Sequence, residues 1–139
     1  MDKLRLGICD DETQDLAQIL EMVKRYDEDC LLQTTTFLHA KDLLYAAKAS
    51  GFDITILDIE MEPPTGFDVA KELIAMPNPP IVIFATKSNA YALKGYGVAI
   101  RYLQKPVAQG DFFEAMDAAI ADATAHRLTF QIDTALVSV

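Results

Sequence analysis

Apolar and polar positions along the chain follow a pattern that predicts five units, each a strand followed by a helix. Every unit begins with a short run of apolar or β-branched residues, which is typical of a buried strand. Most of these runs are followed by a segment with apolar residues three and four positions apart, as an amphipathic helix requires. The predicted strands cover residues 4–9, 31–37, 52–58, 80–86 and 100–106.

The predicted helices differ in the signals that support them. Apolar residues at helical spacing mark four helices, around residues 16–23, 40–47, 69–74 and 110–125. A shorter helix from Ser88, a suitable N-cap, to Gly95 follows the fourth strand. In the last helix, Asp111 and Glu114 have the spacing of a capping box.

Five units of this kind predict one α/β domain with a parallel sheet and helices on both faces, because each parallel connection needs a crossover. Ligands of such sheets bind at the carboxyl ends of the strands, near a switch in strand order. Polar side chains at those ends are therefore the first candidates for a functional site.

Polar residues stand at the ends of four predicted strands. Asp10 and Asp11 follow the first strand, and Asp58 ends the third. Thr86 ends the fourth strand, and Lys105 lies at the end of the fifth. Like charges this close repel one another unless water screens them or a cation binds. Three carboxylates with few basic partners suit a hard divalent cation, so the sequence predicts a Mg²⁺ site at this edge of the sheet.

Each of these residues also has an ordinary structural interpretation when it is taken alone. Asp10 is a suitable N-cap for the first helix, where further acids favour the helix dipole. Asp58 alone is an acid that ends a strand, and Lys105 alone is a solvated loop lysine. Thr86 and Tyr102 alone are a strand residue and a half-buried core residue. The coincidence of these residues on strands that line one cleft favours a common site.

The set ICDDE, ILDIEM, IFAT and YLQKP, in this order and spacing, resembles the receiver domain of two-component response regulators over about residues 4–123. The stretch AYALKGYGVAIRYLQKPV is similar to the same region of regulators that carry a LytTR-type DNA-binding domain. The resemblance implies a flavodoxin-like, doubly wound sheet with strand order 2-1-3-4-5 and five helices. It also implies a phosphoacceptor switch, not an enzyme, whose only catalysis is its own phosphoryl transfer and autodephosphorylation.

The same resemblance assigns roles at the acidic edge. It implies that Asp58 is the phosphoacceptor, which attacks a phosphoryl group from a sensor histidine kinase or a small phosphodonor. Mg²⁺ would bind to Asp11, Asp58 and the backbone carbonyl of Glu60, and to Asp10 through a water. Lys105 would offset charge on the phosphoryl oxygens.

The resemblance further implies a conformational switch. Thr86 would hydrogen-bond the phosphoryl group, and Tyr102 would rotate from exposed to buried. The face made by the fourth helix, fifth strand and fifth helix would then shift toward the state that forms a homodimer. The Lys105–Pro106 peptide is expected to be cis.

Two departures from the family pattern lie beside the predicted site. Met61 is followed by Glu62, and the prolines come only at 63 and 64, so we expect a different loop path after the acceptor. Lys87 replaces the small residue that usually follows the threonine. Its bulk would slow phosphoryl transfer, or its charge would attract phosphate. Gly66 keeps its usual offset from Asp58.

Residues 1–125 are interpreted as the receiver domain and residues 126–139 as a C-terminal tail. Within the tail, LTFQID alternates apolar and polar residues like a strand with one exposed face. It resembles the opening strand of a LytTR-type domain. The tail is then the start of a truncated output domain, or an arm that pairs with another strand.

Composition limits the other function classes. The chain has 139 residues and a formal net charge of −9, which disfavours direct binding to nucleic acid or to a membrane surface. DNA binding is therefore expected only through an output domain outside this chain. The sequence shows no long apolar segment, and its two cysteines, Cys9 and Cys30, suit reduced thiols, so a cytoplasmic location is expected.

Two other functions fit parts of the pattern. A haloacid-dehalogenase-type aspartyl-phosphate hydrolase also places a nucleophilic Asp after an apolar strand, with a second carboxylate two residues later, where Glu60 stands here. A receiver-like interaction module that never takes phosphate is the second alternative, favoured by Lys87 and the altered loop.

Overall fold

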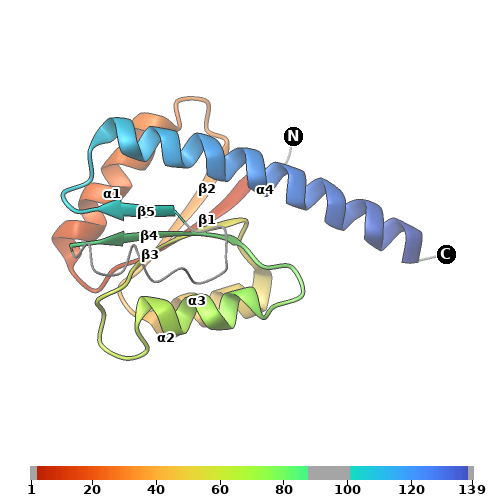
Figure 1. The fold of residues 1–139 in the computed structure, drawn as a ribbon, viewed down its shortest axis with the longest axis horizontal. Helices are drawn as coiled ribbons and strands as arrows, with labels where there is room; N and C mark the ends of the chain where they lie inside the picture. Colours follow the sequence, from red (N-terminus) through yellow and green to blue (C-terminus); the bar gives the residue numbers. More distant parts are fainter. Residues whose placement is uncertain (1–2, 88–100, 138–139) are drawn as a thin grey trace.

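The computed structural model describes residues 3–87 and 101–137, with side chains as far as residue 129. Five strands form one sheet with the order β2-β1-β3-β4-β5, and every neighbouring pair is parallel. This is the predicted fold class and strand order (Figure 1). The strands are β1 (Leu4–Cys9), β2 (Leu32–Phe37), β3 (Ile54–Asp58), β4 (Ile81–Thr86) and β5 (Arg101–Gln104).

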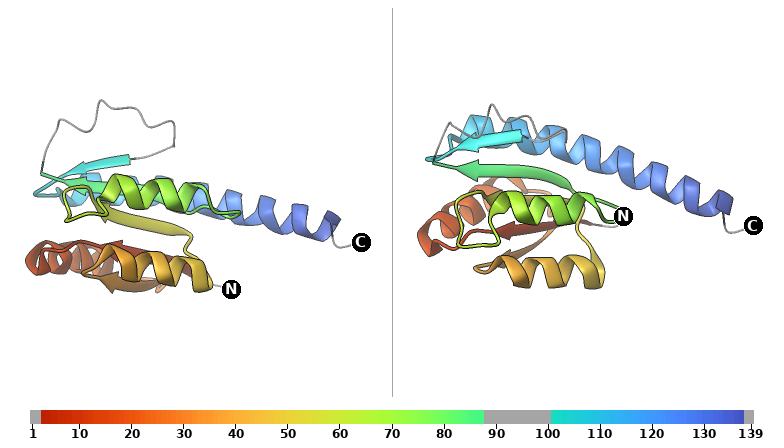
Figure 2. Two further views of the ribbon diagram at one scale, coloured as in Figure 1. Left: turned by 90° about the horizontal axis from the view of Figure 1, so that it is seen from below. Right: turned by 60° about the horizontal axis from the view of Figure 1, so that its bottom comes forward.

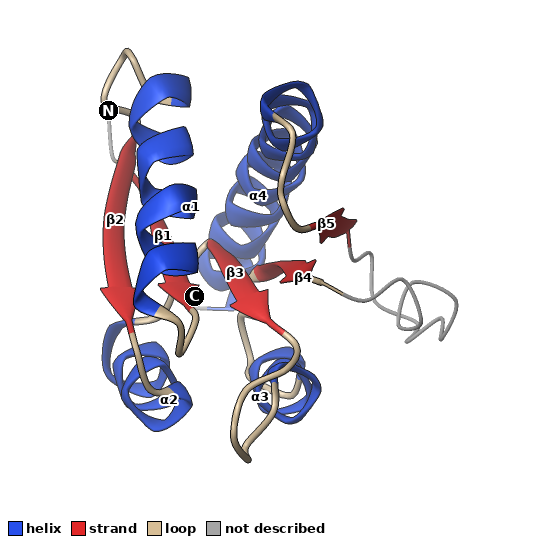
Figure 3. Ribbon diagram, turned by 90° about the vertical axis from the view of Figure 1, so that its left-hand side faces the viewer, coloured by secondary structure: helices blue, strands red, loops and turns tan. Residues whose placement is uncertain are grey.

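Helices cover both faces of the sheet, as the parallel connections require. The described residues form α1 (Thr13–Tyr26), α2 (Ala40–Ser50), α3 (Gly66–Ile74) and α4 (Gln109–Val137). Figure 3 shows α1 and α4 on one face and α2 and α3 on the other. The predicted short helix from Ser88 to Gly95 lies outside the described residues.

Two hydrophobic cores fill the layers, because strands of a parallel sheet bury both faces. Side chains alternate along β3: Ile54 and Ile56 pack beneath α1 and α4, while Leu57 packs beneath α2 and α3. On the first side the largest helix contributions come from Phe112 and Met116, which are fully buried. The sheet is therefore held rigidly between two helix layers, and its strand ends are fixed in space.

No helix among residues 3–87 and 101–137 combines the length and the apolar character that crossing a membrane would need.

The C-terminal tail is helical, so the predicted strand over residues 128–133 is wrong. Helix α4 continues without a break to Val137, and the views in Figure 2 show its last turns extending beyond the sheet. The alternation in LTFQID spans only six residues, and extending an existing helix costs far less than starting a new element. The division into receiver and output segments near residue 125 stays a prediction.

Two side chains hold the extended part of α4 on the domain. Arg127 donates from Nη2 to Asp53 Oδ2 at 2.6 Å, and its guanidinium also reaches the backbone carbonyl of Lys3 at 3.3 Å. His126 Nε2 lies 2.7 Å from Asn78 Oδ1. These contacts join α4 to the amino ends of the strands, opposite the strand ends that carry the acidic residues.

The amino end of α4 differs in detail from the sequence prediction. The helix begins at Gln109, so Asp111 lies in its first turn and is not the N-cap. The capping box of the domain is found on α3, where the Thr65 side chain accepts from Asp68 N and the Asp68 side chain accepts from Thr65 N.

Gly66 is the glycine that the fold restricts most closely beside the acceptor. A Cβ atom there would lie 2.3 Å from the carbonyl oxygen of Asp58 and 2.7 Å from Ile59 Cα. We expect Gly66→Ala to lower the free energy of unfolding by about 2–3 kcal/mol, because overpacking forces backbone to move. Urea unfolding measures the change.

Gly110→Ala is the matched control, because a Cβ at this helical position meets nothing within 4 Å. It should leave stability unchanged or raise it by up to about 1 kcal/mol. Equal unfolding midpoints for Gly66→Ala and the unchanged protein would contradict the close approach of α3 to the acceptor loop.

Candidate functional site

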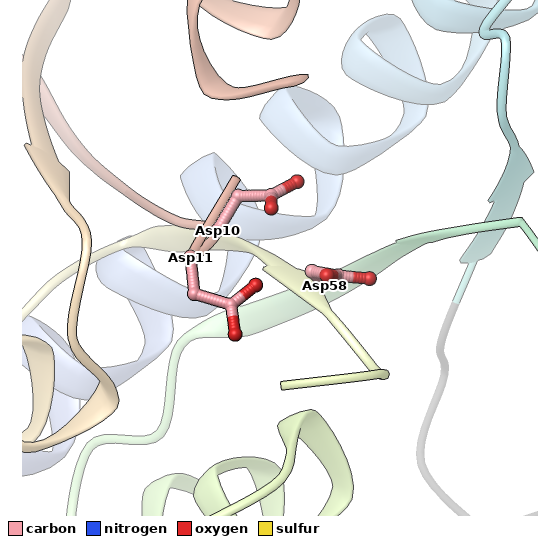
Figure 4. A group of neighbouring side chains, drawn as sticks. All are labelled: Asp10, Asp11 and Asp58. Atoms are coloured by element: carbon pink, nitrogen blue, oxygen red, sulfur yellow. The ribbon is translucent and has the colours of Figure 1, made fainter. Parts of the chain in front are cut away.

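Three carboxylates meet at the carboxyl ends of β1 and β3, as the sequence predicts. The register pairs Cys9 with Leu57, so the next residues, Asp10 and Asp58, lie on neighbouring strands. Asp11 follows in the loop before α1, and Figure 4 shows its carboxylate beside those of Asp10 and Asp58. One oxygen from each of the three lies within 4.8 Å of the others. A single cation at this point would lie close to all three carboxylates.

Backbone N–H groups fix the orientation of each carboxylate. Asp10 Oδ1 accepts from Glu12 N at 3.0 Å, and Asp58 Oδ1 accepts from Glu60 N at 3.3 Å. Asp11 Oδ2 accepts a longer bond from Glu62 N at 3.4 Å. Helix α1 begins at Thr13 after Glu12, so Asp10 is not the N-cap of the helix. The interpretation of Asp10 as the N-cap of the first helix is therefore wrong.

Lys105 reaches the same point from the end of β5. Its Nζ lies 2.7 Å from Asp10 Oδ2 and 3.6 Å from Asp58 Oδ1. The Lys105–Pro106 peptide is cis, as expected, and Lys105 N donates to the Thr86 carbonyl at 2.7 Å. The Lys105 side chain is 8% exposed, so it is not a solvated loop lysine.

The charges in the site shift the pKa values of its members. Burial, with a further contribution from Asp10, raises the pKa of Asp58 to about 6, although Lys105 and the Glu60 N–H oppose the shift. Burial and the neighbouring Asp10 raise the pKa of the Cys9 thiol to about 12. Burial alone would lower the pKa of Lys105, but its hydrogen bonds to Asp10 and Asp15 outweigh this and raise it. The site thus carries a negative field that favours bound cations.

Thr86 and Tyr102 lie on β4 and β5, the two strands that follow β3 in the sheet. Thr86 is buried at the end of β4, next to the strand that ends in Asp58. Tyr102 is half-buried on β5, and its ring centroid lies 5.5 Å from that of Phe84. The switch roles of Thr86 and Tyr102 stay predictions.

The acidic residues open into a cleft of about 580 Å³. The loop after Asp58 forms one wall, and there the Pro63–Pro64 peptide is cis and Met61 is buried. Glu60 is exposed on this wall. Lys87 is 68% exposed and lies at the mouth. The lining residues are Asp11, Glu12, Asp15, Asp58, Ile59, Glu60, Met61, Glu62, Pro63, Thr65, Phe67, Lys87 and Lys105.

Asp15 is a member of the cluster that the sequence analysis missed. It lies in the first turn of α1 and is 18% exposed, and its Oδ2 atom is 3.0 Å from Lys105 Nζ. One signal could have found it, since position 15 follows Asp11 by four residues at the start of a predicted helix. A residue one turn after a functional acid faces the same cleft when the helix begins at that cleft.

Comparison with known proteins gives the family. The family model of the response regulator receiver domain matches residues 6–117. The chain therefore belongs to the response regulator receiver domain family.

The relatives found among curated proteins include LytTR-type regulators, as the sequence resemblance indicates. Sensory transduction protein LytT of Bacillus subtilis (strain 168) is 34% identical over 105 residues, which cover 74% of this chain and 42% of LytT. The positive alginate biosynthesis regulatory protein of Pseudomonas aeruginosa is 33% identical over 110 residues, covering 78% of this chain and 44% of the relative. The chain thus spans less than half the length of these relatives.

Solved structures confirm the fold. The response regulatory domain of protein mrkE from Klebsiella pneumoniae matches with a TM-score of 0.77 at 15% identity, covering 88% of this chain and 99% of that one. The BeF3-activated DrrB receiver domain matches with a TM-score of 0.71 at 20% identity, covering 86% and 98%. At these identities the likeness shows the flavodoxin-like receiver fold alone.

The raised pKa of Asp58 predicts a pH-dependent gain in stability for Asp58→Asn. Because the folded value, about 6, exceeds the unfolded value of 3.8, the Asp58 carboxyl makes the fold less stable as the pH rises from 3.8 to about 6, and the loss is complete above pH 6. Without divalent cations, Asp58→Asn should unfold at higher urea than the unchanged protein, with a gain of about 1–3 kcal/mol at pH 7.5. The gain should fall to roughly half at pH 5.

Asp29→Asn serves as the control, because Asp29 is an exposed acid outside the cluster. It should show no gain that varies between these pH values. A loss of stability in Asp58→Asn at pH 7.5 would contradict the electrostatic cost assigned to the clustered carboxylates.

Proposed function

We propose that this chain is a phosphorylation-dependent switch that accepts a phosphoryl group on Asp58. The observation that carries the proposal is the convergence of three carboxylates and one buried ammonium group at a single point of an open cleft. Receiver domains bind Mg²⁺ at an acidic pocket and act with sensor kinases in two-component systems. A sensor histidine kinase is therefore the proposed donor, in the cytoplasm.

The chemistry that these residues support is phosphoryl transfer by positioning and charge neutralisation. A carboxylate oxygen of Asp58 forms a bond to phosphorus while the P–N bond of a phosphohistidine breaks, and the electron pair leaves with the imidazole nitrogen. Lys105, 3.6 Å from Asp58, offsets charge on the transferred group. The backbone N–H of Glu60 holds the Asp58 carboxylate in place.

The donor set fits Mg²⁺, which prefers oxygen ligands and retains several waters. Asp11 and Asp58 are the proposed direct ligands, with the Glu60 backbone carbonyl as a third. Asp10 already pairs with Lys105, so its proposed role through a water suits its contacts. When bound, the ion supplies positive charge to the phosphoryl oxygens.

The proposed output is a change on the face that carries β5 and the amino half of α4. Thr86 lies next to the acceptor strand, and Tyr102 packs on Phe84 of the neighbouring strand, so both are placed to respond to a new group on Asp58. The state with Tyr102 inward is proposed to form a homodimer. LytT, one of the curated relatives, is a sensory transduction protein. Control of transcription through a LytTR-type output domain is proposed from the resemblance to LytTR-type regulators.

The family assignment favours this switch over the haloacid-dehalogenase-type hydrolase. The interaction module that never takes phosphate remains the competing function, because Lys87 stands at the mouth of the cleft. A test of whether the chain can be phosphorylated distinguishes the two functions.

Incubation with acetyl phosphate and Mg²⁺ should add one phosphoryl group, seen by intact-mass spectrometry. Asp58→Asn should abolish the adduct because the nucleophilic carboxylate is lost. Asp53→Asn, at an acid from the opposite end of β3, should retain it. No adduct in the unchanged protein with donor in excess would establish the interaction module instead.

Mg²⁺ should raise the melting temperature of the unchanged protein. A ligand that binds only the folded state stabilises it by about 1.4 kcal/mol at ten times its Kd. Asp11→Asn removes a proposed ligand and should abolish most of the shift, whereas Asp42→Asn, on the exposed side of α2, should leave it intact. Equal shifts in all three proteins would rule out a metal site at Asp11.

A further inference from the structure

Asp15 lies between the two lysines of the cleft. Its Oδ2 atom is 3.0 Å from Lys105 Nζ and 3.8 Å from Lys87 Nζ. The three side chains come from α1, from the loop before α4 and from the residue after β4, so only the folded sheet brings them together. Both ion pairs of Asp15 involve the positive charges that a phosphate anion would meet on entry.

The hydrogen bonds of Lys105 show what an entering phosphate would displace. An ammonium group has three donors, and two are directed to Asp10 at 2.7 Å and Asp15 at 3.0 Å. The contact with Asp58 is longer, at 3.6 Å. A phosphoryl oxygen on Asp58 is therefore an alternative acceptor to Asp15 for the same ammonium group.

The cleft has more acids than lysines, so competition for the lysines affects how well the cleft can bind an anion. Six carboxylates and two ammonium groups line the cleft, and the lysines are Lys87 and Lys105. Asp10 is buried behind the cleft, whereas Asp15 is partly exposed to it. Asp15 is thus the acid that reduces the attraction of both lysines for an anion while adding repulsion of its own.

We propose that Asp15 is a positioning residue that competes with phosphate for Lys105 and Lys87 and thereby restricts the entry of small phosphate anions into the cleft. The proposal deepens, and rests on, the proposed phosphoacceptor function. It gives Lys87 a definite role, because this lysine becomes available to the anion when Asp15 no longer holds it.

The test is Asp15→Asn, which removes the charge and keeps the size of the side chain. Titration with inorganic phosphate in the presence of Mg²⁺, followed by NMR, should show a Kd about threefold to tenfold lower than in the unchanged protein. The acetyl phosphate concentration that gives half-maximal phosphorylation rate should fall by a similar factor, and the maximal rate should change less. A residue with only a structural role would not move these two constants together.

Two control variants distinguish the effect of the Asp15 contacts with the lysines from the effect of the net charge of the cleft. Glu12→Gln removes one charge from an exposed acid in the same cleft, and we expect less than a twofold effect on either constant. Lys87→Ala combined with Asp15→Asn should lose part of the gain, since one of the released cations is gone. An equal gain in Glu12→Gln would overturn the proposal, because through-space charge would then explain it.

The outcomes also separate this proposal from the function on which it rests. Phosphate affinity is measured without phosphoryl transfer, so it decides the role of Asp15 even if the unchanged protein forms no adduct. A Kd for phosphate in Asp15→Asn that equals or exceeds the original value overturns the competition. An adduct that forms normally together with an unchanged Kd leaves the phosphoacceptor function standing and removes only the proposed role of Asp15.

Discussion

The contact of one buried ammonium group with the clustered carboxylates is the interaction on which the site depends. Lys105 Nζ lies 2.7 Å from Asp10 and 3.6 Å from Asp58, so its charge offsets part of the repulsion between these acids. Removing the ammonium group would leave the clustered acids uncompensated, which is more costly than the cluster itself. Lys105 does not offset the whole cost of a charged Asp58, because burial and the neighbouring Asp10 still raise the pKa of that carboxyl to about 6. The remaining negative charge is what makes the site receptive to a metal ion.

The parallel sheet brings segments that are far apart in the sequence together at one site. The acids follow β1 and β3, which are neighbours in the centre of the sheet, and Lys105 follows β5 at the edge. Its side chain reaches Asp10, which follows β1, although β3 and β4 lie between β1 and β5 in the sheet. The helix layers on both faces fix these strand ends, so the positions of the charged groups are set by the core and not by the charges themselves.

The sequence predicted the sheet and the meeting of Asp10, Asp11, Asp58 and Lys105 at its carboxyl end because their signals are local and strong. Short apolar runs that end in polar residues identify strand ends, and the carboxyl edge of a parallel sheet gathers them. The tail was predicted wrongly, because a six-residue alternation carries little information against the continuation of a helix. Asp15 was missed for a different reason. Its offset of four residues from Asp11 is a local signal that it faces the cleft, but its pairing depends on the reach of Lys105 and Lys87 from other elements, and no local pattern encodes that distance.

Helix α4 is one continuous helix that runs from the carboxyl ends of the strands toward their amino ends. At 29 residues it is about 43 Å long. It starts shortly after Lys105, and Arg127 binds Asp53, which lies just before the amino end of β3. Arg127 lies nearer the carboxyl end of α4 than its amino end, with about 27 Å of helix before it and about 15 Å after it. A tilt of about 5° about this contact would move the carboxyl end by only about 1.3 Å, so the guanidinium–carboxylate pair limits how far a movement near the cleft is carried along the helix.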